Sequence, residues 1–161
     1  MSAIQLIADT NVVSYAFRGT PIGRDYLELM GDRRIGVTGL CLAELRAGTI
    51  LGRWGDRKVD ELVRFFRRFT HVREAEGMAA VCGALRAIRA QVGRPIDLPD
   101  AWAAATALWL DVPLVTHDRD LQGIPDLRIL TLHNDWRVGE EASDAFETGR
   151  LRVGDEPRML S

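Results

Sequence analysis

Short apolar runs that stop abruptly at polar residues constrain the fold of this chain more than any other feature. The first run, residues 4–8, is rich in β-branched and other apolar residues and ends at Asp9-Thr10-Asn11. Comparable runs lie at 35–38, 113–116 and 127–132, with a brief one near 70–72. Apolar runs without polar alternation are typical of strands that are buried on both faces.

The segments between these runs have helical patterns. Helices are predicted at 12–17, 22–30, 59–69, 75–92 and 98–110, and another begins after Thr38 and ends near Gly48 or Gly52. Thr38 is a suitable N-cap, and Gly93 with Pro95 stops the helix before them. Strands that alternate with helices predict an α/β fold in which a parallel sheet is covered on both faces.

Length and composition exclude several other classes of protein. The 161 residues fit one domain, two cysteines do not form a disulfide framework, and no stretch is long and apolar enough for a membrane span. The N-terminus lacks the pattern of a signal peptide, so we expect a soluble cytoplasmic protein. We expect residues 1–133 to form the folded domain. Residues 134–161 form a polar acidic tail, with a net charge of −3 and no role assigned from the sequence.

Carboxylates follow several of the predicted strands. Asp9 follows the first strand, Glu44 lies two turns into the helix after the second, Asp97 and Asp100 begin the helix at 98–110, and Asp118 and Asp120 follow the strand at 113–116. In parallel sheets the functional crevice lies at the carboxyl ends of the strands. Carboxylates gathered there repel one another unless a cation joins them. Oxygen ligands without cysteine or a histidine pair favour Mg²⁺ or Mn²⁺, which can activate water for phosphodiester hydrolysis.

Each of these acids also has a purely structural interpretation. Asp9 and Asp97 are suitable N-caps for the helices that follow them. Asp118 and Asp120 are typical turn residues, and Glu44 could point to solvent. His117, next to Asp118, is expected to face solvent rather than to bind metal.

Four blocks of sequence carry a resemblance to a known family. They are Ile7-Ala8-Asp9-Thr10-Asn11, Thr38-x5-Glu44-Leu45, Asp100-Ala101-Trp102-Ala103-Ala104-Ala105-Thr106-Ala107 and Leu114-Val115-Thr116-His117-Asp118-Arg119-Asp120-Leu121. In this order and spacing, over residues 4–133, the chain resembles PIN domains, and most of all the VapC toxins of type II toxin–antitoxin pairs. The resemblance implies a three-layer α/β/α sandwich with a mostly parallel central sheet. It also implies a Mg²⁺- or Mn²⁺-dependent endoribonuclease, a homodimer that is silenced by a VapB-like antitoxin.

The resemblance also assigns roles to individual residues. Asp9, Glu44, Asp100 and Asp118 match the metal-binding and catalytic acids, and Asp97 and Asp120 leave the third and fourth assignments open to a shift. Thr10, Asn11 and Thr116 match small polar positions that support the acids or the attacking water. One or two ions would be held there, and cleavage would leave 5′-phosphate and 3′-hydroxyl ends.

Basic residues provide candidates for RNA contact. All but one of the 21 basic residues are arginine, whose planar group bonds phosphate oxygens in pairs. Arg46 follows the Glu44-Leu45 pair, and Arg57, Arg64 and Arg68 belong to a basic helix face that is either an RNA-backbone track or simply solvated.

Two other classes of function remain open. One is a different metal-dependent phosphohydrolase on a Rossmann-like sheet, such as a haloacid-dehalogenase-type phosphatase. That group needs an Asp-x-Asp pair after the first strand, and here Asp9 is followed by Thr10-Asn11. The other is a PIN-type module that binds RNA or protein without catalysis. Such modules usually lose acids from the site, whereas all four positions are filled here.

Overall fold

The computed structural model describes residues 3–133, and the acidic tail at 134–161 lies outside the described residues. In chain order the elements are β1 (Leu6–Ala8), α1 (Thr10–Arg18), α2 (Pro21–Met30), β2 (Ile35–Val37), α3 (Gly39–Leu51), α4 (Asp56–Phe66), β3 (Thr70–His71), α5 (Glu76–Gln91), α6 (Leu98–Leu110), β4 (Leu114–Val115), a short 3₁₀ turn (Arg119–Leu121) and β5 (Ile129–Leu130). Every helix and strand predicted from the sequence is present. The largest boundary difference is at α4, which ends at Phe66 rather than near residue 69.

The five strands form one parallel sheet in the order β3-β2-β1-β4-β5. The chain builds outward from β1 through β2 to β3, then crosses to the other side of β1 for β4 and β5. The order therefore reverses between β1 and β4, where Ala8 pairs with Val115. Ligands of open α/β sheets bind outside the carboxyl ends of the strands at such a switch point.

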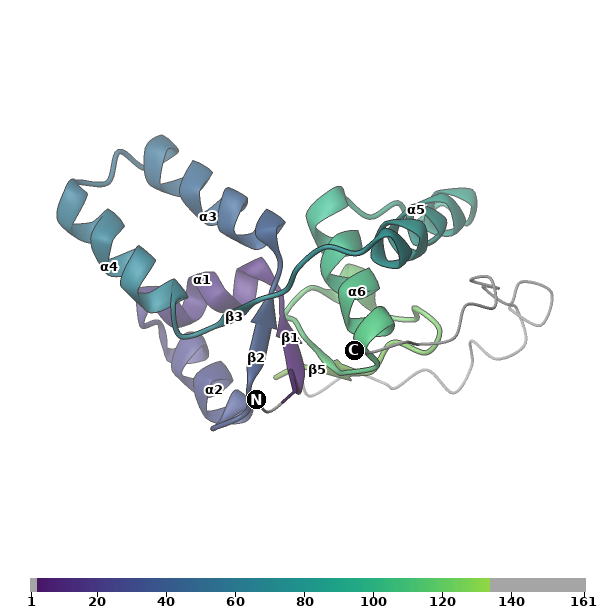
Figure 1. Cartoon of the computed structure of the whole chain (residues 1–161), viewed down its shortest axis with the longest axis horizontal. Coiled ribbons are helices and arrows are strands. Elements are labelled where there is room, and N and C mark those ends of the chain that lie inside the picture. The colour runs from purple at the N-terminus through teal and green to yellow at the C-terminus, as the bar shows by residue number, and fades with distance from the viewer. Residues whose placement is uncertain (1–2, 134–161) are drawn as a thin grey trace.

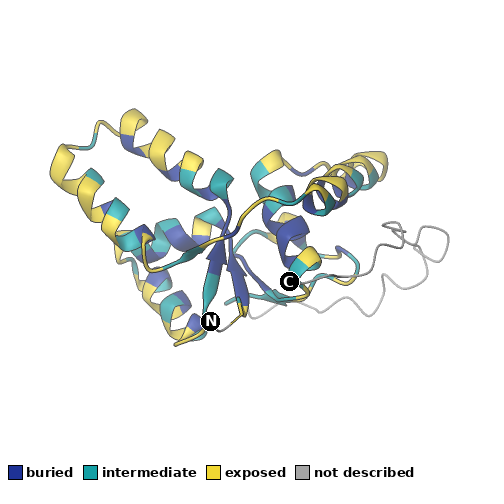
Figure 2. Ribbon diagram, in the orientation of Figure 1, coloured by how far each residue is buried: buried dark blue, intermediate teal, exposed yellow. Residues whose placement is uncertain are grey.

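Helices cover both faces of this sheet (Figure 1), which confirms the three-layer α/β/α prediction. Alternate residues of β1 point to opposite faces, so Leu6 and Ala8 pack with α1–α4 while Ile7 packs with α5 and α6. The central strands β1, β2 and β4 are mostly buried, as Figure 2 shows, whereas the edge strands β3 and β5 are partly exposed. Burial of each large aliphatic side chain contributes roughly 1.5–3 kcal/mol, which holds the two helical layers on the sheet.

Local signals in the sequence set the helix boundaries. Asp9, Thr38 and Asp97 cap α1, α3 and α6, each by accepting a hydrogen bond from a backbone N–H in the first turn. Gly36 is required in β2, because a Cβ atom there would lie 2.8 Å from Ile7 Cδ1 and 2.9 Å from Val72 Cγ2. The three caps set the residues at which α1, α3 and α6 begin.

No helix within residues 3–133 has the length and apolar character that crossing a membrane requires.

Candidate active site

Asp9 and Thr116 occupy adjacent positions at the switch point, one residue beyond β1 and β4. The Asp9 carboxylate is 2 % exposed, and it accepts hydrogen bonds from the Thr116 hydroxyl and from the backbone N–H of Asn11 at 2.9 Å. The Thr116 hydroxyl also accepts from the backbone N–H of Asp118 at 3.0 Å. One hydroxyl thus ties the acid after β1 to the acid in the loop after β4.

Glu44 reaches the same edge of the sheet from α3. Its residue is exposed, and Oε2 accepts a hydrogen bond from the hydroxyl of Thr10, the first residue of α1. Cys41, one turn earlier, lies between the acids. Burial, followed by the charges of Asp9 and Glu44, raises the pKa of its thiol to about 12. Cys41 is therefore a protonated packing residue at neutral pH and not a nucleophile.

Asp100 enters from the other helical layer, in the first turn of α6. Its backbone N–H donates to the side chain of the N-cap residue Asp97 at 3.1 Å. Burial, then the charges of Asp9 and Asp97, then a hydrogen bond with the Asp118 side chain raise the pKa of Asp100 to about 8. Without a cation, Asp100 therefore holds a proton at neutral pH.

The acids from the four chain segments form one electrostatic cluster. Burial raises the pKa of Asp9 above its ordinary value. The hydrogen bonds from Thr116 and Asn11 oppose this shift, while the charges of Asp118 and Glu44 add to it. Burial is the largest cause of the raised pKa at both Asp9 and Asp100. We refer to Asp9, Glu44, Asp100 and Asp118 together as the carboxylate cluster.

The chemistry of the carboxylate cluster fits a hard divalent cation. All of its donors are carboxylate oxygens, and their mutual repulsion would be relieved by a positive ion. As the side chains stand, no group of three or more His, Cys, Asp or Glu residues within 3–133 is arranged so that it could hold a metal ion. Instead, the Asp9 and Glu44 carboxylates accept hydrogen bonds from the hydroxyls of Thr116 and Thr10.

The two additional acids, Asp97 and Asp120, have different surroundings. Asp97 caps α6, as the structural interpretation predicts, and its charge acts on Asp100. Asp120 donates its backbone N–H to Asp118 Oδ1 at 2.8 Å, and its own carbonyl oxygen accepts from the Arg89 guanidinium. Asp120 lines a neighbouring pocket together with Arg89. Asp97 thus borders the carboxylate cluster, while Asp120 contacts Asp118 on one side and lines the neighbouring pocket on the other.

His117 does not face solvent as expected from the sequence. It is half-buried: its Nδ1 lies 2.8 Å from the Tyr26 hydroxyl, and its ring stacks on His133 with centroids 4.0 Å apart. Burial, then the neighbouring His133 and Arg119, lower the pKa of His117 below its ordinary value. The ring is therefore held as a neutral group that packs behind the loop carrying Asp118.

Tyr26 is a supporting residue that the sequence did not reveal. It is fully buried, and its hydroxyl lies 3.1 Å from the Thr116 carbonyl oxygen and 3.3 Å from the Leu132 backbone nitrogen. These bonds fix the end of β4 and therefore the position of the Thr116 hydroxyl. A tyrosine inside an amphipathic helix gives no sequence signal for such a role.

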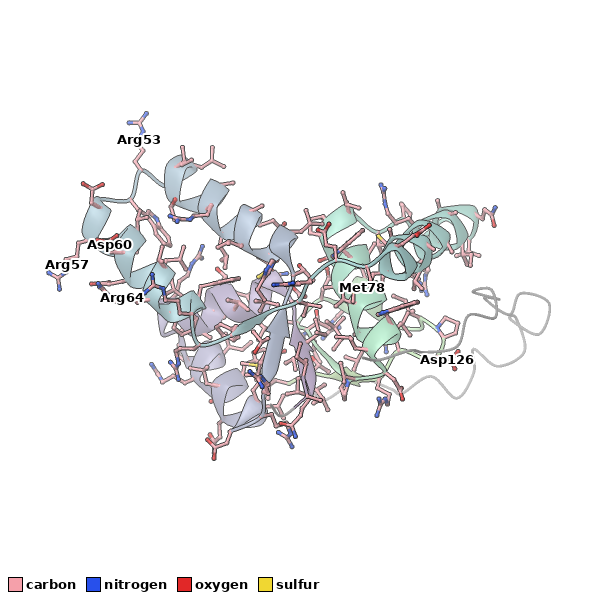
Figure 3. The ribbon with its side chains drawn as sticks, in the orientation of Figure 1. Arg53, Arg57, Asp60, Arg64, Met78 and Asp126 are labelled. Carbon is pink, nitrogen blue, oxygen red and sulfur yellow. The ribbon has the colours of Figure 1, made fainter. Side chains whose placement is uncertain are left out.

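The four arginines named from the sequence as candidates for RNA contact are solvent-exposed. Arg57, whose side chain is 92 % exposed, pairs with Glu61 at 3.2 Å, and Arg68 lies over the Phe65 ring. Arg46 and Arg64 are also exposed. Figure 3 shows Arg57 at the outer end of the α3–α4 arm, away from the sheet.

Fold and site together define an α/β protein with an acidic centre at the switch point of a parallel sheet. A family model described as "PIN domain" matches residues 6–127. The chain belongs to the PIN domain family, whose members are in general nucleases. No curated protein matches the chain in sequence.

Solved structures share this fold. VapBC2 from Rickettsia felis bound to a promoter DNA fragment contains a chain that is 24 % identical, with a TM-score of 0.69 over 78 % of this chain and 97 % of that one. For DNA-bound VapBC from Salmonella typhimurium, the identity is 23 % and the TM-score is 0.69, over 80 % of this chain and 98 % of that one. For VapBC-1 from nontypeable Haemophilus influenzae, the identity is 25 % and the TM-score is 0.67, over 78 % of this chain and 96 % of that one. The described domain therefore corresponds to nearly the full length of these chains.

Proposed function

We propose that this protein is a Mg²⁺- or Mn²⁺-dependent endoribonuclease and the toxin of a VapBC-type toxin–antitoxin pair. The observation that carries the proposal is the convergence of acids from four chain segments at the switch point. Burial and mutual repulsion there raise the pKa of Asp100 to about 8. Such a cluster is costly to a fold unless it binds a cation, which supports a metal-dependent role.

Asp9, Glu44, Asp100 and Asp118 would hold one or two divalent ions. A bound ion supplies charge neutralisation for the phosphodiester and lowers the pKa of an attacking water. Thr116 and the Asn11 backbone orient Asp9, and Thr10 orients Glu44. Asp100 releases its proton when positive charge enters the site, which couples ion binding to pH.

The partners proposed are RNA as substrate and a VapB-like protein as inhibitor, with the toxin acting as a homodimer in the cytoplasm. The similar structures support the protein partner, since they are VapBC assemblies, and a further similar structure is a toxin–antitoxin complex from Klebsiella pneumoniae. Ile50 and Leu51, 76 % and 83 % exposed at the end of α3, offer apolar surface for a protein contact. A small DNA-binding protein encoded next to this gene is expected to copurify with the toxin and inhibit it.

The test is cleavage of single-stranded RNA by the Asp9→Asn protein. Asparagine keeps an oxygen for the Asn11 N–H and has nearly the same volume, so the fold is expected to persist. Cleavage is expected to fall at least about 100-fold, the loss typical of removing one electrostatic stabiliser of a transition state. The matched control is Asp60→Asn, at an exposed position on α4.

Two results would contradict the proposal. Full activity of a folded Asp9→Asn protein would remove the carboxylate cluster from the mechanism. RNA binding without cleavage by the unmodified protein would instead identify a non-catalytic PIN module. If the unmodified protein does cleave RNA, mapping the 5′ ends of the products defines its target.

A further inference from the structure

A second concave site lies beside the carboxylate cluster. It is a pocket of about 480 Å³ between the end of α5 and the 3₁₀ turn. It is lined by Arg89, Arg94, Arg119, Asp120 and Gln122, together with one proline and two glycines. Three arginines against one aspartate give the pocket a positive balance, and its lining contains few apolar side chains. This composition favours an anion over an apolar ligand. We call it the arginine pocket.

Arg89 is the most unusual member of the arginine pocket. It is 7 % exposed, although arginine is almost never so buried unless it is paired. Its Nη2 donates to the carbonyl oxygen of Asp120. Its Nε is buried and has no hydrogen-bond partner, and it is the one side-chain nitrogen or oxygen within residues 3–133 of which both are true.

The charge of Arg89 is incompletely balanced. Burial and the charge of Arg94 lower the pKa of Arg89 from its ordinary value, and only the Asp120 charge opposes them. A guanidinium remains protonated at neutral pH despite such a shift. Arg89 and Arg94 therefore carry like charges at the same pocket, and Asp120 is the acidic residue that lines it. An anion bound there would relieve the repulsion.

The arginine pocket lies next to the carboxylate cluster, because Asp120, which lines it, donates its backbone N–H to Asp118. Arg119 directly follows Asp118, and Arg94 precedes Asp97, the N-cap of α6, by three residues. Three residues of extended chain span at most about 11 Å. The segment that carries Arg94 and the segment that carries Arg119 are therefore each within a few residues of an acid at the switch point. A single polymer strand could contact both places.

We propose that the arginine pocket binds a backbone phosphate of the RNA strand next to the phosphate that is cleaved. The proposal rests on the ribonuclease function above and adds a positioning site to it. Arginine guanidinium groups bond phosphate oxygens in pairs, which suits this pocket. The pocket would hold one flank of the strand while the carboxylate cluster acts on the neighbouring bond.

The test is RNA binding and cleavage by the full-length Arg94→Gln protein. Arg94 is exposed, so its replacement is expected to leave folding unchanged, unlike replacement of buried Arg89. The matched control is Arg86→Gln, an exposed arginine of α5 that lies one turn before Arg89 and does not line the pocket. Binding of a fluorescent single-stranded RNA is measured by anisotropy in EDTA over a range of salt concentrations. Cleavage is measured with Mn²⁺.

Loss of one phosphate contact has a defined signature. In Arg94→Gln the slope of log Kd against log salt is expected to fall by about 0.7, with weaker binding at low salt. KM for RNA is expected to rise several-fold while kcat changes little. Arg86→Gln is expected to match the unmodified protein in both measurements.

Three outcomes would overturn the proposal. Equal salt slopes and equal KM for the two variants would show that the pocket does not touch RNA. Tighter RNA binding by Arg94→Gln would assign the pocket to an acidic group that competes with RNA, such as the carboxylates of the acidic tail. Absence of RNA binding by the unmodified protein would overturn this proposal together with the proposed function. A reduced salt slope in a protein that never cleaves RNA would support the pocket and refute only the enzyme activity.

Discussion

Raising the pH in the absence of divalent ions is expected to destabilise this protein through Asp100. Its pKa is about 8 in the folded chain, whereas its ordinary value is 3.8. Between about pH 4 and about pH 8 the folded protein therefore holds a proton that the unfolded chain has released. Stability falls with pH wherever the folded state binds more protons, so it is expected to decline across this interval and to level off above it.

The size of the decline follows from the position of Asp100. Each unit of pKa difference corresponds to about 1.4 kcal/mol. Because Asp100 is only half-buried, solvent screening is expected to reduce the full difference to about 2–3 kcal/mol. For a chain of this length that corresponds to a fall in Tm of roughly 5–10 °C. Mn²⁺ binds the deprotonated carboxylates, so it is expected to restore stability most strongly near pH 8.

The assay is chemical unfolding in EDTA at several pH values, for the unmodified protein and for Asp100→Asn. The substitution removes the titrating group, so the difference in unfolding free energy between the two proteins is expected to grow from pH 4 to pH 8. Asp60→Asn serves as the control and is expected to follow the unmodified protein. A constant difference between Asp100→Asn and the unmodified protein at all pH values would refute the reasoning.

Two further predictions concern packing and hydrogen bonding. Gly23→Ala is expected to destabilise the protein by about 1–3 kcal/mol, because its Cβ would lie 2.0 Å from the backbone oxygen of Tyr15. Gly83→Ala on α5 meets nothing within 4 Å and is expected to stabilise by about 0.5–1 kcal/mol; equal effects in thermal unfolding would contradict this. Thr116→Val removes the hydroxyl that donates to Asp9, so we expect a loss of about 1–3 kcal/mol in chemical unfolding and slower RNA cleavage. Unchanged cleavage by Thr116→Val would show that Asp9 needs no such support.

The order of elements could be predicted from the sequence because local signals specify it. The apolar run before Asp9 indicates a buried strand. Asp9 then caps the helix that begins at the next residue. The same holds for Thr38 and Asp97, whose capping roles are decided by the neighbouring backbone. The rule that parallel strands end at one edge then places the acids near one another.

The details of the site could not be predicted because they depend on side-chain directions across distant segments. Nothing local to Tyr26 indicates that its hydroxyl reaches His117, 91 residues away. The burial of Arg89 is equally hidden, since α5 carries Arg86 and Arg89 one turn apart and nothing local to either shows which one is buried. The hydrogen bond between Thr10 and Glu44 depends on how α1 and α3 pack.

The most direct test of the central claim is the metal dependence of RNA cleavage. The full-length protein is dialysed against EDTA, and the cleavage rate of a single-stranded RNA is measured as Mn²⁺ or Mg²⁺ is added. If the carboxylate cluster holds the catalytic ion, cleavage is absent in EDTA, returns along a saturable curve, and fails to return in Glu44→Gln. Equal cleavage in EDTA and in Mn²⁺ would contradict the account.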